Sequence, residues 1–133
     1  MERVRRATAA IALVLATGCG GSSHADAKVF CQRLERLSEN DPFRAFGARA
    51  TTTEIETAFD ALQTSASGLA AVAPDDARSA ARAYADSVDR MRSLLQGAAF
   101  DGSQVDQRAY RDAQVDYFAA STRLERYLTS SCR

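Results

Sequence analysis

The chain has 133 residues, with 17 basic and 17 acidic side chains, one histidine and a hydrophobic fraction of 46%. This length accommodates one domain, and the hydrophobic fraction is that of a folded chain rather than a disordered one. The balanced charge argues against a nucleic-acid-binding protein, because such proteins usually carry an excess of basic residues.

The first eighteen residues have the pattern of a secretion signal. Residues 1–6 contain three arginines, and an apolar run follows from Ala7 to Ala16. A helix of about ten residues is about 15 Å long, which is roughly half the hydrocarbon thickness of a bilayer. The run is therefore too short for an ordinary membrane span and is typical of a signal peptide.

Small residues directly before a cysteine follow this run. The sequence of Ala16–Cys19, ATGC, resembles the lipobox of bacterial lipoproteins. In that family the cysteine sulfur is alkylated with diacylglycerol, and a peptidase cuts directly before the cysteine. The resemblance implies that residues 1–18 are a lipoprotein signal peptide and that Cys19 carries the lipid.

A lipid on Cys19 would place the protein on the outer face of the bacterial cell membrane. Residues 19–133 have a slight acidic excess, so the acyl chains, rather than a basic face, would hold the protein there. The alternative is a secreted protein, because residues 25–27 offer an A-x-A cleavage pattern.

Cysteine usage agrees with export. If Cys19 carries lipid, Cys31 and Cys132 remain as a pair, and outside the cytoplasm such a pair is expected to be oxidised. The disulfide would close a loop of about 100 residues, for which the chain-entropy model gives roughly 4.7 kcal/mol. Two free thiols or an intermolecular link are the alternatives. No metal site is expected, because two cysteines and His24 supply too few ligands.

Residues 19–27 are rich in glycine and serine and predict a flexible tether, which leaves a helical domain over 28–133. The first predicted helix runs from about Asp26 to Glu39. The second begins near Thr53, which matches a capping box with Glu56, and ends before Pro74. Apolar residues recur at helical spacing in both segments. They are Phe30, Leu34 and Leu37, then Ile55, Phe59, Leu62, Ala66 and Leu69.

The third predicted helix opens with Pro74 at its first position and has Gly97 directly after its end. The fourth starts near Ser103 and ends just before Cys132, and no segment alternates with the period of a strand. The two apolar stripes consist of Ala77, Ala81, Tyr84, Val88, Met91 and Leu95, and of Val105, Ala109, Ala113, Tyr117, Ala120, Leu124 and Leu128.

These segments predict an all-α fold, an up-down-up-down four-helix bundle closed by one disulfide. In that topology the first helix starts at the end where the fourth finishes, so Cys31 and Cys132 would lie close together. The structural alternative is a three-helix bundle with a short N-terminal arm.

The connections at the opposite end of the bundle contain three phenylalanines. Residues 40–52 hold Phe43 and Phe46, and residues 97–103 hold Phe100. In one interpretation these rings cap the end of the core. In the other they form a partner surface, because aromatic side chains in loops can anchor a binding partner.

Catalysis has little support in the sequence. The single histidine lies in the predicted tether, and the chain has no nucleotide-binding or zinc-protease motif. Tyr84 and Tyr117 lie on the apolar stripes and are expected in the core rather than in a ligand site. Asp112 and Asp116 share a helix face, which we interpret as solvated rather than metal-binding.

The lipobox, the richness in alanine and arginine and the two flanking cysteines resemble small lipoproteins common in high-GC Gram-positive bacteria. This resemblance implies no particular activity. We expect a non-enzymatic, membrane-anchored extracytoplasmic lipoprotein that needs no cofactor and binds a protein or cell-envelope partner. The alternative is an extracytoplasmic carrier of an apolar or haem-like ligand between its helices. The sequence does not indicate an oligomeric state.

Overall fold

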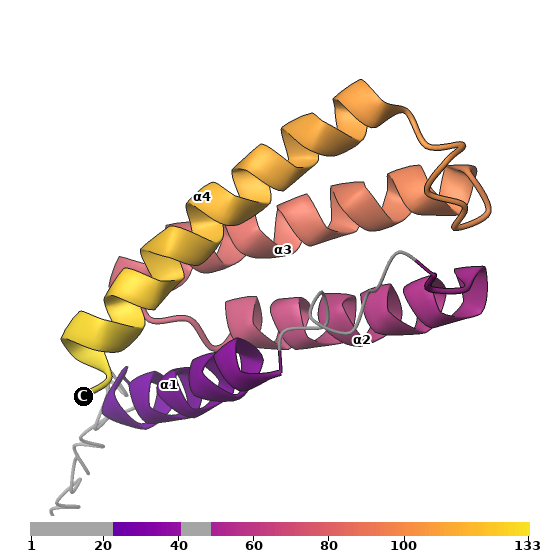
Figure 1. Ribbon diagram of the computed structural model, residues 1–133. Coiled ribbons are helices and arrows are strands. Elements are labelled where there is room, and N and C mark those ends of the chain that lie inside the picture. Colours follow the sequence, from indigo (N-terminus) through magenta and orange to yellow (C-terminus); the bar gives the residue numbers. More distant parts are fainter. Residues whose placement is uncertain (1–22, 41–48) are drawn as a thin grey trace, which may run out of the picture.

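The computed structural model describes residues 23–40 and 49–133, and within these ranges the chain forms four helices and no strand (Figure 1). Successive helices run in opposite directions, and a disulfide joins Cys31 to Cys132. The predicted all-α bundle closed by one disulfide is therefore confirmed. The helices are α1 (Ser23–Glu39), α2 (Thr52–Ala71), α3 (Asp75–Gly97) and α4 (Gln107–Ser131).

The central element of the fold is α3, which packs extensively against both α2 and α4. No Cα atom of α2 lies within 8 Å of a Cα atom of α4. The shorter α1 contacts both α2 and α4, near the end of the molecule where the chain finishes (Figure 1). The bundle is thus a layer of three helices with α1 closing one end.

The predicted apolar stripes form one continuous core. On α3 every predicted position is buried, and Ala81 and Val88 have no exposed surface. Ala109 and Leu128 at the two ends of the α4 stripe remain partly exposed. The largest side chains that are less than 2% exposed come from three of the four helices. They are Phe30 of α1, Phe59 and Leu69 of α2, and Met91, Val88 and Ser87 of α3.

The first two helices begin earlier than the sequence pattern predicts. α1 starts at Ser23, within the segment expected to be a tether and before the expected start at Asp26. The capping box of α2 is formed by Thr51 and Glu54 rather than by Thr53 and Glu56. The Thr51 hydroxyl accepts from the Glu54 N–H at 3.2 Å, and the Glu54 carboxylate accepts from the Thr51 N–H at 2.9 Å. The observed residues, Thr51 and Glu54, and the predicted residues, Thr53 and Glu56, are both three positions apart. The capping-box pattern alone therefore does not distinguish them.

The turn from α3 to α4 also differs from expectation. Gly97 is the last helical residue, and Ala99 (φ 52°) and Phe100 (φ 58°) take the left-handed conformation instead. α4 is capped by Asp106 rather than Ser103, because the Asp106 carboxylate accepts from two backbone N–H groups of the first turn. Ser103 instead donates to Asp101 within the turn.

At the start of α3, Pro74 is the cap residue, with an extended backbone, rather than the first helical residue. The two acids that follow it occupy the first turn of the helix, where a negative charge interacts favourably with the helix dipole. The helix therefore begins one residue later than predicted, and the two acids still stabilise its first turn.

Candidate functional site

The residues singled out in the sequence fall into two groups. Cys19, Phe43 and Phe46 lie outside the described residues. Cys31, Cys132 and Phe100 lie inside them, and the structure brings the two cysteines together at one end of the molecule while Phe100 lies at the other.

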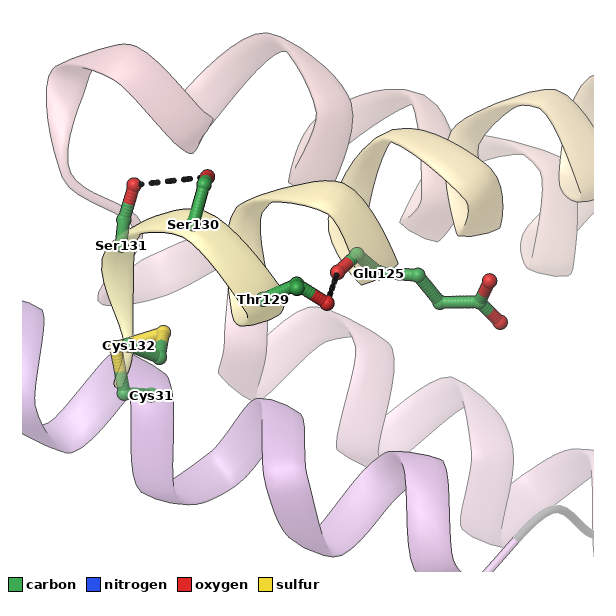
Figure 2. Close-up of a disulfide and its surroundings, with 6 residues drawn as sticks. All are labelled: Cys31, Glu125, Thr129, Ser130, Ser131 and Cys132. Carbon is green, nitrogen blue, oxygen red and sulfur yellow. Dashed lines mark hydrogen bonds between the residues drawn. A yellow bond between two sulfur atoms is a disulfide. The ribbon is translucent and has the colours of Figure 1, made fainter.

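The disulfide joins the middle of α1 to the end of α4 (Figure 2). The Cα atoms of Cys31 and Cys132 lie 5.5 Å apart although the residues are 101 positions apart in the sequence. Cys132 is the residue directly after the last turn of α4. The predicted intramolecular pairing is therefore confirmed, and both alternatives, free thiols and an intermolecular link, are wrong.

Two non-covalent contacts hold α1 beside the disulfide. The ring of Phe30 has no exposed surface and meets the ring of Tyr127 edge-on, with centroids 5.4 Å apart. The Arg33 guanidinium donates to the backbone carbonyl of Gly68 at 2.8 Å. A Cβ atom at Gly68 would lie 3.1 Å from Arg33 Nη1, so the glycine leaves room for this close approach. α1 thus docks on α4 through an aromatic pair and on α2 through a hydrogen bond.

Tyr127 contacts more than one helix at this end. Burial of its hydroxyl raises the pKa of Tyr127 above the ordinary value of 10.0, and the nearby Asp76 carboxylate raises that pKa further. Asp76 lies in the first turn of α3. Tyr127 therefore lies at the meeting point of α1, α3 and α4.

A second tyrosine contact lies in the interior between α3 and α4. The hydroxyl oxygens of Tyr84 and Tyr117 are 3.3 Å apart, and their ring centroids are 5.0 Å apart. Tyr84 is 4% exposed and Tyr117 is 8% exposed. The expected core position of both tyrosines is confirmed. Their hydroxyl contact meets part of the hydrogen-bonding requirement of these two buried polar groups.

At the opposite end, Phe100 is a core residue. Its ring is 6% exposed, and the Arg92 guanidinium lies 5.9 Å from the ring centroid. Arg92 is in turn held by Asp60 at 2.7 Å and by Gln96 at 3.2 Å. A ring enclosed in this way is not available to a partner without rearrangement, so the structure supports the core interpretation for Phe100.

Open grooves lie between neighbouring helices. One runs between α1 and α2, and another runs between α3 and α4, where Arg90 pairs with Asp116. Within the described ranges, no three His, Cys, Asp or Glu side chains are grouped so that they could hold a metal ion. None of the described helices is both long enough and apolar enough to cross a membrane.

One surface feature was missed by the sequence analysis. Val115 and Phe118 on α4 are 62% and 61% exposed, the highest values among the exposed large apolar side chains of the described residues. The signal was present in the sequence, because both residues lie off the apolar stripe of this helix.

Comparisons with protein-family models, with curated proteins and with solved structures found no match to this chain.

Proposed function

We propose that this protein is an extracytoplasmic lipoprotein, anchored to the outer face of a bacterial cell membrane through lipid on Cys19. Its function would be to bind a protein or another cell-envelope component without catalysing a reaction. The lipobox-like sequence supports the anchor, and the Cys31–Cys132 disulfide supports an oxidising compartment.

The single observation that carries the proposal is the disulfide. It is joined at both ends to regular helices, and Cys31 directly follows the fully buried Phe30 in the sequence. Such bonds are characteristic of exported proteins and are rare in the cytosol, where thiols are kept reduced. The disulfide also uses both cysteines other than Cys19, which leaves that residue as the one available for a lipid.

The binding role is supported by the kinds of surface that the helices present. Two open grooves and one exposed apolar pair lie on the described helices. Tyr84 and Tyr117, whose hydroxyls could otherwise serve a reaction, are buried with those hydroxyls in contact. A nucleophile needs an adjacent base and access to a substrate, so this arrangement favours a binding role over a catalytic one.

The test is the intact mass of the protein extracted from its native membrane without reduction. The proposal predicts a chain that begins at Cys19, carries acyl lipid and lacks the two hydrogens removed by disulfide formation. A Cys19→Ala variant is the matched control and should keep its signal peptide and carry no lipid. A lipid-free wild-type chain that begins near Lys28 and is recovered from the medium would contradict the anchor.

The same spectra test the alternative of a ligand carrier. A small apolar or haem-like molecule that co-purifies at stoichiometric amount would appear as extra mass in a native spectrum, and haem would also add visible absorbance. The binding proposal predicts neither signal from the washed membrane extract.

A further inference from the structure

The outer face of α4 carries a seam of exposed side chains that no described helix covers. Its members are spaced alternately four and three residues apart, which keeps them on one face of a helix. All of them are exposed, and we name this surface the α4 seam. It consists of Arg111, Val115, Phe118, Thr122 and Glu125.

The centre of the α4 seam is apolar. Val115 and Phe118 project large apolar side chains that are more than half exposed. The Thr122 hydroxyl donates to the Phe118 backbone carbonyl at 2.9 Å, so its hydrogen-bonding capacity is partly met within the helix. One turn beyond the seam, Thr129 makes the same contact with the Glu125 carbonyl at 3.0 Å (Figure 2). The threonine hydroxyls therefore turn toward their own helix.

The ends of the α4 seam carry opposite charges. Arg111 lies seven residues before Phe118, and Glu125 lies seven residues after it. Fourteen helical residues span about 21 Å, so these two side chains cannot pair within one chain. Within the described residues, neither side chain has an ion pair or a hydrogen bond through its charged group.

We propose that the α4 seam is a homodimer interface in which α4 packs antiparallel against α4 of a second copy. A two-fold axis at Phe118 places the two Phe118 rings together. Val115, three residues before the axis, then lies within one residue of the level of Thr122 of the other copy, four residues after it. The same axis brings Arg111 of each copy to Glu125 of the other, which gives two ion pairs. The placement of opposite charges, Arg111 and Glu125, at equal separations of seven residues before and after Phe118 is what selects a second copy of this chain as the partner.

A neighbouring pair of charges fits the same arrangement. Asp112 and Arg126 lie beside the α4 seam on one flank, and the antiparallel arrangement brings Asp112 of one copy near Arg126 of the other. Both side chains are exposed.

One helix from each copy buries a small area, so the dimer is expected to be weak in dilute solution. Confinement of both copies to one membrane would raise their effective concentration and favour it.

The test exchanges charges at the two ends of the α4 seam. Two differently tagged full-length copies are produced in one cell, extracted from the membrane and examined for co-purification. Arg111→Glu alone and Glu125→Arg alone should each reduce co-purification by about tenfold, since each replaces both ion pairs by repulsion. The double variant Arg111→Glu/Glu125→Arg should restore it.

A mixture of the two single variants makes the test specific for antiparallel pairing. When one tagged copy carries Arg111→Glu and the other carries Glu125→Arg, both charge contacts again join opposite signs. The mixed pair should therefore co-purify as the wild type does, although each single variant fails to pair with itself. Arg82→Glu, an exposed reversal on α3, is the matched control and should leave co-purification unchanged.

Phe118→Ser should also abolish co-purification. Because this ring is 61% exposed, the variant should keep its helical content and its midpoint of urea unfolding. A wild-type protein that is monomeric in the membrane would overturn the proposal. Single reversals that leave pairing unchanged, or a mixture of single variants that does not recover it, would also overturn it.

Discussion

The ring of Phe30 in α1 packs edge-on against the ring of Tyr127 in α4, with centroids 5.4 Å apart. This pair lies beside the Cys31–Cys132 disulfide and is the aromatic part of the contact between the two helices. Besides this pair, α1 contributes Leu34 to the core, and no Cα atom of α1 lies within 8 Å of a Cα atom of α3. The docking of α1 therefore depends on a small number of strong interactions.

The contribution of this aromatic pair can be measured by a double-mutant cycle. Phe30→Leu and Tyr127→Leu should each lower the free energy of unfolding, and we expect a coupling energy of about 0.5–1.5 kcal/mol between them. Urea unfolding of the four proteins with the disulfide intact provides the measurement. Additive effects of the two substitutions would show that the rings stabilise the fold independently.

Removal of the disulfide should destabilise the protein and should act first on α1. We expect the double variant Cys31→Ala/Cys132→Ala to lose about 2–5 kcal/mol of unfolding free energy, because its unfolded chain is no longer held in a long closed loop and gains conformational entropy. Hydrogen exchange should show that the α1 amides lose protection before those of α3.

The neighbouring double variant Ser130→Ala/Ser131→Ala is the control for changes at this end of α4. These hydroxyls lie 3.3 Å apart at the surface and form no hydrogen bond to another helix in the described part of the chain (Figure 2). The variant should unfold as the wild type does. Equal loss of protection along α1 and α3 in the cysteine variant would show that the docking of α1 does not depend specifically on the disulfide.

The capping box of α2 predicts a difference between two nearby threonines. Thr51→Ala should cost about 1 kcal/mol of unfolding free energy, because the Glu54 N–H loses its hydrogen-bond acceptor. Thr53→Ala should change stability by less than about 0.5 kcal/mol, since this residue lies inside the exposed first turn. Urea unfolding of both variants provides the measurement. A larger loss of stability in Thr53→Ala than in Thr51→Ala would place the capping box at Thr53 and contradict a helix start at Thr52.

Tyr110 should make the free energy of unfolding decrease at alkaline pH. Burial raises the pKa of Tyr110 above the ordinary value of 10.0 because the phenolate is less well solvated in the folded protein. The folded state therefore holds this proton more tightly than the unfolded state. The resulting stability is complete below pH 10 and is lost as the pH rises from there through the folded pKa.

The pH dependence can be measured by urea unfolding between neutral and strongly alkaline pH. Tyr110→Phe should flatten the decrease in unfolding free energy, because the variant has no proton to lose at this position. Part of the decrease should remain through Tyr127, whose pKa is also raised, by burial and then by Asp76. An unchanged slope in the Tyr110 variant would show that its hydroxyl is equally solvated in both states.

The sequence by itself determined the helices, their core faces and the cysteine pairing. Apolar residues such as Phe59 and Val88 recur at the period of an α-helix, and burial of that face is the main source of stability. Alternating helices also bring the start of the first near the end of the last, which made the pairing of Cys31 with Cys132 predictable.

The tertiary structure decided those features for which the sequence pattern allowed several equally good alternatives. Two capping boxes were consistent with the start of α2, and only the path of the chain selects Thr51. The central position of α3, the enclosure of Phe100 by Arg92 and the exposure of Phe118 depend on which helices become neighbours. Periodicity shows which face of a helix is apolar, but contacts between distant residues determine what that face meets.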